Sequence, residues 1–291
     1  MPYASAMFSW DDLGDTRPAV MGVVNVTPDS FSDGGRWLDP DAAVAHGLAL
    51  VAAGADLLDV GGESTRPGAA PVGVAEERRR VETVIARLVA VAGVPVSVDT
   101  TKAAVARAAL DAGARIVNDV SAGRFDADML ALVADRGAGF VAMHMLGDPR
   151  TMQDDPRYGD VVAEVGDFLL ERADAARAAG VAPGAIAVDP GIGFGKTTAH
   201  NLALLARLDQ LVARVGVPVV VGTSRKRFIG RVLAGVAGET GEPRADQRDD
   251  GTLATTVWAA ECGARVARVH DVRGATQALA LIALLPTVAA A

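Results

Sequence analysis

Short runs of apolar, mostly β-branched residues recur along the whole chain and alternate with longer, alanine-rich stretches. Runs that are apolar throughout are typical of strands buried on both faces, and such strands occur in parallel sheets covered by helices. The alternation therefore predicts eight strands, at Ala19–Val24, Ala55–Val60, Val94–Val98, Ala114–Val117, Gly139–Met143, Ala185–Val188, Val217–Val221 and Ala264–Val269.

Glycines mark where several of the intervening helices end. Gly54, Gly113 and Gly263 each stand directly before a predicted strand, and a glycine in the left-handed conformation commonly ends a helix. The stretch after the third predicted strand has the clearest helical spacing of apolar residues. Thr100 and Thr101 precede this stretch and are predicted to cap its N-terminus.

Eight strand–helix units in a chain of 291 residues predict a (β/α)8 TIM barrel, an α/β fold whose active site lies at the C-terminal rim of the parallel strands. A doubly wound open sheet shows the same alternation and is the alternative fold. No linker divides the chain, so we expect one domain, with the barrel over residues 18–291 and an N-terminal extension over residues 1–17. The polar stretch Gly238–Asp250 is predicted to be a loop.

The composition argues against several classes of protein. A single cysteine, Cys262, cannot form a disulfide framework. A formal net charge of −8 and an aromatic content of 4% argue against nucleic-acid binding, which needs a basic surface or stacking rings. No apolar stretch approaches the ~18 residues of a membrane-spanning helix, and the first residues lack the pattern of a signal peptide. We therefore expect a cytoplasmic protein with small-molecule partners.

Polar residues follow the predicted strands at almost every strand end. One aspartate in such a place is often only the cap of the next helix, but the carboxyl ends of all strands of a barrel share one rim. Polar residues at so many ends therefore predict a functional site at that rim. The residues are Asn25, Asp59, Glu63, Asp99, Asn118, Asp119, His144, Asp189, Lys226, Arg268 and His270.

Two short segments bear on the ligand of this site. The segment Gly191–Thr197 looks like a nucleotide phosphate loop, but that loop requires a glycine where this chain has Pro190. We interpret its glycines as allowing the backbone to lie close to a flat ligand. The segment Ser224–Arg227 follows the seventh strand, and Arg268 lies two residues from His270 on the eighth. These cations predict a local anion site within an acidic protein.

A series of motifs runs in order from about Ala19 to the C-terminal helix. Two long stretches, Met21–Gly35 and Asp59–Gly68, are the most specific. The shorter stretches are Ser97–Thr100, Val117–Val120, Met143–Met145, Asp189–Lys196, Ser224–Lys226 and Arg268–Asp271. With these motifs the chain resembles the dihydropteroate synthases, a family of pterin-binding barrels in folate biosynthesis.

The resemblance implies that 6-hydroxymethyl-7,8-dihydropterin pyrophosphate condenses with p-aminobenzoate, giving 7,8-dihydropteroate and pyrophosphate. The catalytic residues that it implies are Asp33, Arg66, Asp99 and Lys226. The residues implied to bind the pterin are Asp99, Asn118, Met143, Asp189, Phe194, Gly222 and Lys226. Those implied to contact p-aminobenzoate are Phe31, Thr65, Arg66, Pro67 and Ser224. Those implied to contact pyrophosphate are Thr65, Arg66, Arg268 and His270.

The resemblance also implies a cofactor, an assembly and moving loops. Mg²⁺ would be held by Asn25, the protein would form a homodimer, and the family is a target of sulfonamides. The loops Thr27–Gly35 and Ser64–Gly68 would close over the site, and their glycine, proline and serine content predicts that they are mobile without ligands.

The side-chain chemistry agrees with these assignments. A buried carboxylate such as that of Asp189 can accept hydrogen bonds from two adjacent N–H donors of a pterin edge, although it can also support the turn that follows it. Arg268 and His270 can offset the charge of departing pyrophosphate. Two other functions stay open: a pterin barrel like the methyltetrahydrofolate methyltransferases, and a non-catalytic pterin-binding paralogue.

Overall fold

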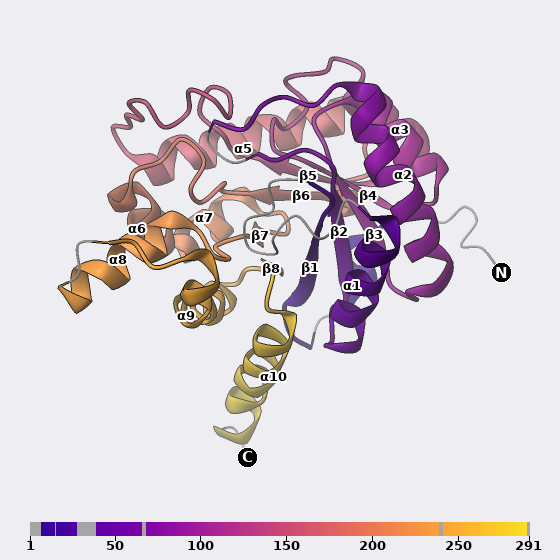
Figure 1. Ribbon diagram of the computed structural model, residues 1–291. Helices are drawn as coiled ribbons and strands as arrows, with labels where there is room; N and C mark the ends of the chain where they lie inside the picture. Colours follow the sequence, from indigo (N-terminus) through magenta and orange to yellow (C-terminus); the bar gives the residue numbers. More distant parts are fainter. Residues whose placement is uncertain (1–6, 15, 28–38, 66–67, 239–240, 290–291) are drawn as a thin grey trace.

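A computed structural model describes residues 7–14, 16–27, 39–65, 68–238 and 241–289 of the chain. The strands all run parallel, in the order β6-β5-β4-β3-β2-β1-β8-β7, and a backbone bridge between Val188 and Val219 brings the two ends together (Figure 1). This order runs around a barrel without reversing, so the (β/α)8 fold is confirmed. The strands are β1 Ala19–Asn25, β2 Leu57–Gly61, β3 Val96–Asp99, β4 Ile116–Asp119, β5 Gly139–Met143, β6 Ile186–Asp189, β7 Val220–Val221 and β8 Val266–Val269.

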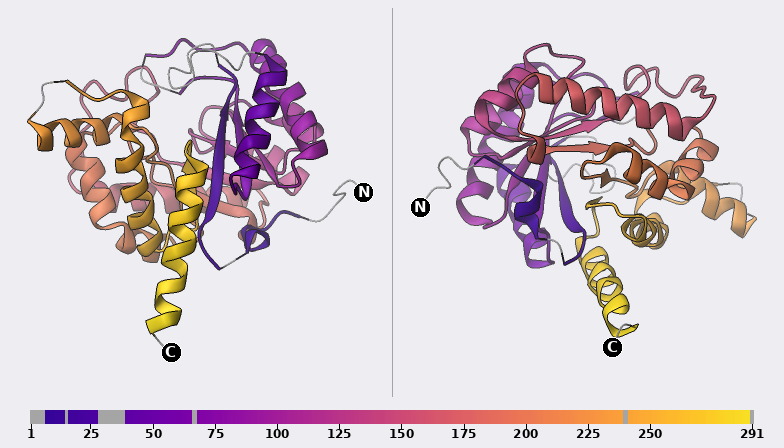
Figure 2. Two further views of the ribbon diagram at one scale, coloured as in Figure 1. Left: turned by 60° about the horizontal axis from the view of Figure 1, so that its bottom comes forward. Right: turned by 180° about the vertical axis from the view of Figure 1, so that it is seen from behind.

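Helices surround the strands on the outside of the barrel, as the two views of Figure 2 show. The α-helices are α1 Pro40–Ala52, α2 Val74–Val91, α3 Ala103–Asp111, α4 Met129–Arg136, α5 Val161–Ala178, α6 Thr198–Ala206, α7 Leu208–Val215, α8 Arg227–Ala237, α9 Asp249–Glu261 and α10 Val272–Ala289. Short 3-10 helices are η1 Trp10–Leu13, η2 Pro183–Ala185 and η3 Ala245–Arg248. None of the helices in the described ranges is long and apolar enough to cross a bilayer.

Every predicted strand is present, but most begin later than predicted. The glycines Gly54, Gly113 and Gly263 have φ angles of 104°, 102° and 90°, which confirms the left-handed helix ends. The residue after each glycine still belongs to this turn: the N–H of Ala55, for example, donates to the carbonyl of Leu50. The strands therefore start beyond the turn and extend instead into the polar residues at the rim.

The predicted cap of α3 is wrong. The helix begins at Ala103 with Lys102 in the N-cap position, and the side chain of Lys102 makes no capping hydrogen bond. The carboxylate of Asp126 accepts from the backbone N–H of Ala103 at 2.8 Å. The hydroxyl of Thr100 donates instead to the buried carboxylate of Glu77 at 2.6 Å. Because this hydroxyl satisfies a buried acceptor on α2, it ties the end of β3 to the neighbouring helix. Its contact with the start of α3 is a hydrogen bond accepted from the backbone N–H of Lys102 at 3.2 Å.

The stretch Gly238–Asp250 is also more ordered than the predicted loop, within the part that the structure describes. It contains η3, and α9 already begins at Asp249. The guanidinium of Arg248 explains this order, because it is buried and donates to the carbonyls of Pro243 at 2.9 Å and Arg225 at 3.0 Å.

The interior of the barrel has an apolar layer beneath a polar one. Along several strands a polar residue follows an apolar core residue by two positions, as Asp59 follows Leu57, and Asn118 follows Ile116. Because residues two apart on a strand share a face, the polar side chains lie directly above the apolar layer. The apolar layer consists of Phe8, Trp10, Ala19, Met21, Leu57, Ile116, Val141, Ala187, Val220 and Val266.

Two members of the apolar layer come from the segment before the first strand. The rings of Phe8 and Trp10 meet edge to face at 5.1 Å, and both side chains are buried. The indole N–H of Trp10 donates to the carbonyl of Ala185 at 2.9 Å, and the backbone N–H of Phe8 donates to Gly137. This segment therefore closes the end of the barrel opposite the polar rim.

The substitution Trp10→Phe is expected to lower the free energy of unfolding by ~1–3 kcal/mol, because it leaves the buried carbonyl of Ala185 without a donor. Trp258→Phe is the matched control. The indole of Trp258 also donates to a carbonyl, that of Leu205 at 2.7 Å, but the side chain is 49% exposed and water can replace it. Urea denaturation that shows equal losses for both variants would contradict this account.

Candidate active site

The predicted site residues of β1, β2 and β3 face one space at the rim. A Cβ placed on Gly61 would lie 3.7 Å from Oδ1 of Asn25 and 3.8 Å from Oδ2 of Asp99. A glycine at this position keeps the space between the two side chains open. Two oxygen ligands from different strands therefore point at the same region of the mouth.

Arg268 is held between two carboxylates. Its Nε donates to Oδ2 of Asp59 at 2.7 Å, and its Nη2 donates to Oδ2 of Asp99 at 2.9 Å. Burial lowers the pKa of Arg268, but Asp59 and Asp99 outweigh it and raise that pKa above its ordinary value. The predicted anion-binding cation thus belongs to a cluster with two buried carboxylates and is itself 22% exposed, an arrangement that the spacing of cations in the sequence did not predict.

Asp99 titrates close to neutrality. Burial raises the pKa of Asp99 to about 7, Arg268 opposes this, and the carboxylates of Asp59, Glu77 and Asp119 add to it. The side chain therefore changes between its neutral and charged forms in the physiological range of pH. Its charged form is suited to favour positive charge on a ligand in the mouth.

Asp189 and Lys226 are two further titratable residues of the rim, and they influence each other electrostatically. Burial raises the pKa of Asp189 and lowers that of Lys226 to about 8, while each group opposes the shift of the other. Oδ1 of Asp189 accepts from the backbone N–H of Gly191 at 2.6 Å, so the carboxylate does support the turn. Nζ of Lys226 donates to the carbonyl of Ile192 and lies 4.7 Å from the ring centroid of Phe194.

An apolar wall lies beside this pair. Met143 packs in a cluster with Val120, Met145 and Met152, and Phe194 lies against it. On the other side of the mouth, a Cβ on Gly222 would make an ordinary van der Waals contact, 3.7 Å, with Cβ of Arg268. Glycine at this position adds no side chain beside Arg268.

Ser224 and His270 contact each other, although the resemblance assigns them to different ligands. Oγ of Ser224 lies 2.9 Å from Nδ1 of His270 and accepts from its backbone N–H at 3.1 Å. Thr65 is half-buried and makes no hydrogen bond to the other candidate residues in the described ranges. Phe31, Asp33, Arg66 and Pro67 lie outside the described residues, as does most of the loop Thr27–Gly35, whereas Ser64, Thr65 and Gly68 of the second loop are described.

The segment that looks like a phosphate loop uses its lysine internally. Nζ of the buried Lys196 donates to the carbonyls of Gly191 and Phe194, both at 3.0 Å, and lies 2.8 Å from Nδ1 of His144. Burial and the nearby Lys196 lower the pKa of His144 to about 2, so the imidazole stays neutral. This lysine shapes the loop that carries Phe194, a role that the sequence motif did not indicate.

The described residues contain no group of three or more His, Cys, Asp and Glu side chains that could hold a metal ion. Mg²⁺ needs few protein ligands when phosphate oxygens and water supply the rest, and it prefers oxygen. The amide oxygen of Asn25 is a donor of suitable chemistry, whereas Oδ2 of Asp99, which faces the same space, already accepts from Arg268.

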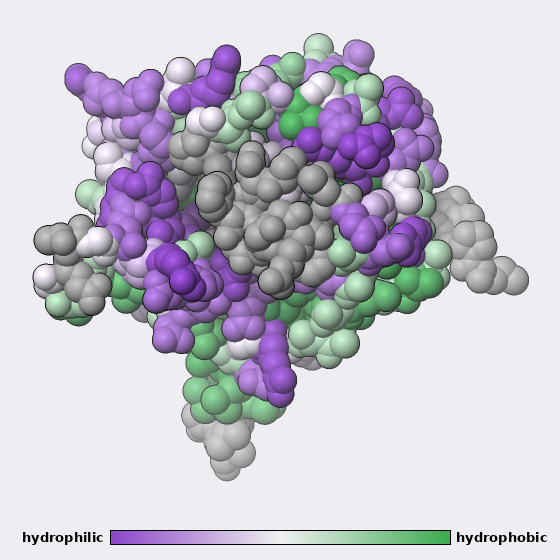
Figure 3. All heavy atoms as spheres, in the orientation of Figure 1, coloured by the Kyte–Doolittle hydropathy of each residue, from purple (hydrophilic) through white to green (hydrophobic). Residues whose placement is uncertain are grey.

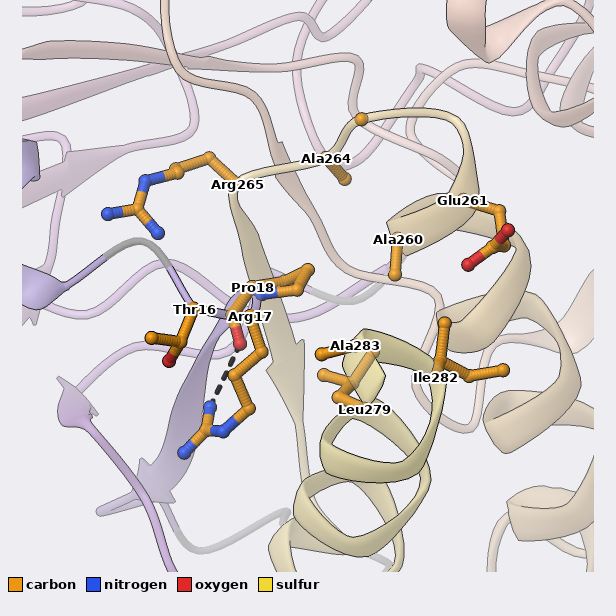
Figure 4. Close-up of a pocket in the computed structure, with 11 residues that line it drawn as sticks. Thr16, Arg17, Pro18, Ala260, Glu261, Ala264, Arg265, Leu279, Ile282 and Ala283 are labelled. Atoms are coloured by element: carbon orange, nitrogen blue, oxygen red, sulfur yellow. Dashed lines mark hydrogen bonds between the residues drawn. The ribbon is translucent and has the colours of Figure 1, made fainter. Parts of the chain in front are cut away.

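A surface pocket at the opposite end of the barrel is a poor second candidate. It lies between the start of β1 and the helices α9 and α10 (Figure 4). Its cations are already engaged, since Arg17 pairs with Asp56 at 2.7 Å and Arg265 donates to the carbonyls of Trp10 and Gly14. The pocket therefore offers an anion neither a free guanidinium nor the strand ends at which barrels bind ligands.

Comparisons with known proteins agree with this geometry. The sequence model of the "Pterin binding enzyme" family matches residues 21–270. The chain is 54% identical over 264 residues to a dihydropteroate synthase of Mycobacterium leprae, covering 90% of this chain and 92% of the relative.

Two solved structures of a Xanthomonas albilineans dihydropteroate synthase are similar in fold. The structure with 4-aminobenzoic acid has a TM-score of 0.83 and 50% identity, covering 96% of this chain and 95% of that one. The structure with 7,8-dihydropteroate has a TM-score of 0.78 and 45% identity, with the same coverage of 96% and 95%. Because the family match and the relatives span nearly the whole chain, this chain belongs to the dihydropteroate synthase family of pterin-binding enzymes.

Proposed function

We propose that this protein condenses 6-hydroxymethyl-7,8-dihydropterin pyrophosphate with p-aminobenzoate, forming 7,8-dihydropteroate and releasing pyrophosphate. The observation that carries the proposal is the meeting of two kinds of group at one rim: Asp189 and Lys226 beside the apolar wall of Met143 and Phe194, and the cluster of Arg268 next to His270. The relatives bind 4-aminobenzoic acid and 7,8-dihydropteroate, which are one substrate and the product of this reaction.

The pterin ring is held by its polar edge and its faces. One oxygen of Asp189 accepts from Gly191, and the other oxygen can accept from the ring. Lys226 supplies a donor for the carbonyl or a ring nitrogen of the pterin. Met143 and Phe194 pack against the ring faces, and their apolar surface excludes water from the hydrogen bonds.

The reaction breaks the bond between the methylene carbon of the pterin and a pyrophosphate oxygen, and the electron pair leaves with the pyrophosphate. The amine nitrogen of p-aminobenzoate forms the new bond to this carbon and loses a proton. Arg268 and His270 offset the charge that gathers on the leaving group. The carboxylate of Asp99 favours the positive charge that develops on the methylene carbon and the conjugated ring.

The kcat/KM of the enzyme is expected to rise with pH up to about 7, where Asp99 ionises. Below this pH the neutral carboxyl cannot offset positive charge, so kcat/KM falls about tenfold for each pH unit. Asp99→Asn is expected to remove this dependence. If kcat/KM of the variant rises with pH by the same factor, the ionising group is the pyrophosphate of the substrate. That result would contradict the role given to Asp99.

The stability of the ligand-free protein provides a control that needs no substrate. Asp99 in the unfolded chain ionises near its ordinary pKa of 3.8, whereas in the folded protein it keeps its proton to about 7. Its contribution to the free energy of unfolding is therefore present at low pH and is lost as the pH rises through this window. The free energy of unfolding of the wild type, relative to that of Asp99→Asn, should decrease as the pH rises from about 4 to about 7.

Mg²⁺ is the cofactor in this proposal, held by Asn25 together with the pyrophosphate of the substrate. The donor chemistry at the mouth supports this, since the amide oxygen of Asn25 faces the space beside Gly61 at the rim. A hard cation there supplies further positive charge to the leaving group. Its removal by a chelator is expected to weaken binding of pyrophosphate while leaving binding of the unphosphorylated pterin unchanged.

The protein is also proposed to act as a homodimer in the cytoplasm. Support for a homodimer comes from α10, where Leu281, Leu284 and Leu285 are more than half exposed. Apolar residues gather at the lower edge of the face in Figure 3, where α10 lies. Exposed apolar surface of this kind is typical of a subunit interface.

A further inference from the structure

Asp59 is a buried carboxylate to which the proposed reaction gives no part. It lies on β2, two residues before Gly61, and its side chain is completely buried. Its Oδ2 accepts two hydrogen bonds, from Nδ2 of Asn118 at 3.0 Å and from Nε of Arg268 at 2.7 Å. Its Oδ1 has no partner among the described residues. A buried carboxylate is costly, and its two contacts both belong to predicted ligand-binding residues.

The contact with Asn118 decides how its amide is oriented. An asparagine amide has a donor end and an acceptor end, whereas a carboxylate only accepts. The NH₂ group must therefore face Asp59, since the opposite orientation would place two oxygens against each other. The carbonyl oxygen of Asn118 then faces away from Asp59, and no described residue donates to it.

We propose that Asp59 is a positioning residue that holds Asn118 with its carbonyl oxygen toward the ligand. The rim then offers acceptors from both Asn118 and Asp189, so the edge that it recognises must be rich in N–H donors. This inference rests on the proposed function, because it takes the pterin as the ligand. Asp59 also accepts from Nε of Arg268, and Asp99 accepts from its Nη2. Asp59 therefore orients two groups: Asn118, which faces the pterin, and Arg268, which faces the pyrophosphate.

A double-mutant cycle separates the action on Asn118 from any other role. The probe is 6-hydroxymethyl-7,8-dihydropterin, whose binding is followed by calorimetry; it has no phosphate and therefore leaves Arg268 out of the measurement. Asp59→Ala is expected to weaken its binding ~10-fold or more. In the Asn118→Leu background the same substitution should have almost no effect, because Asp59 then has no amide to orient.

Two further variants show whether the effect is specific. Asp59→Asn is expected to recover most of the affinity, because its carbonyl oxygen can accept both bonds of Oδ2. Ser97→Ala is the matched control: Ser97 is the partner of Asp59 on β3, is equally buried, and its Oγ makes no hydrogen bond in the described structure. It should bind the probe as the wild type does.

A measurement on the ligand-free wild type keeps the inference testable if Asp59→Ala fails to fold. In NMR spectra of protein labelled at asparagine, the side-chain N–H signals of Asn118 should exchange with water far more slowly than those of an exposed asparagine. Rapid exchange would overturn the inference, as would equal effects of Asp59→Ala in both backgrounds. Slow exchange without any binding of the probe would leave Asp59 in its role and contradict the proposed function instead.

Discussion

Asp189→Asn is expected to fold normally and to lose pterin affinity ~100-fold or more. The carbonyl oxygen of asparagine can replace Oδ1 as the acceptor for Gly191, so the turn keeps its hydrogen bond. The new NH₂ group then takes the place of the second oxygen and faces the N–H donors of the pterin. A mispaired buried contact costs ~1–3 kcal/mol, and the lost charge of the acceptor adds to this.

Asp119→Asn is the matched control for this prediction. Asp119 is another buried aspartate at the end of a strand, but its two oxygens accept from the backbone of Ser121 at 2.7 Å and Gly123 at 2.8 Å. Its substitution should lower the melting temperature and leave pterin affinity unchanged. If instead Asp189→Asn melts early and binds the pterin normally, Asp189 serves the turn alone and another group holds the ring.

Arg268→Ala is expected to have two large effects. It removes a charge-assisted contact to pyrophosphate, worth ~1.5–3 kcal/mol or ~10–100-fold in affinity. It also leaves the buried carboxylates of Asp59 and Asp99 without their common partner, which is expected to lower the free energy of unfolding by ~3–5 kcal/mol. Calorimetry with pyrophosphate and with the unphosphorylated pterin separates the first effect from the second.

Arg265→Ala is the matched control for Arg268→Ala, because Arg265 lies three residues earlier in the chain. Arg265 lies just before β8 at the opposite end of the barrel and donates to the carbonyls of Trp10 and Gly14. Its loss should affect stability and leave pyrophosphate affinity unchanged. An equal loss of affinity for pyrophosphate and for the unphosphorylated pterin in Arg268→Ala would mean that the arginine supports the whole mouth rather than binding the anion.

The fold and the position of the site could be predicted because both follow from short-range patterns. Apolar runs predicted the strands, and glycines such as Gly54 predicted the helix ends. The polar residues after the runs, among them Asp99 and Asp189, fall at the rim because parallel strands of a barrel share one polarity. The strand boundaries were less accurate, since the hydrogen bonds of each turn extend beyond its glycine.

The pairing of charges could not be predicted in the same way. Arg268 and Asp59 are 209 residues apart in the chain, and which carboxylate meets the guanidinium depends on the register of the strands around the barrel. The position of Lys196 could not be predicted either. A lysine in a glycine-rich loop can point outward to a ligand or inward to the loop, and the structure shows the inward position. Asp59 itself was predicted to lie at the rim, but its contacts with Asn118 and Arg268 had no signal in the sequence.

The central claim, that the rim joins a pterin to p-aminobenzoate, is tested most directly by following pyrophosphate and dihydropteroate together. Wild-type protein is mixed with the dihydropterin pyrophosphate and Mg²⁺, with and without p-aminobenzoate. The account predicts equal amounts of both products, formed only when p-aminobenzoate is present. Binding of the pterin without any release of pyrophosphate would contradict it, and would instead indicate a pterin-binding protein that is not a synthase.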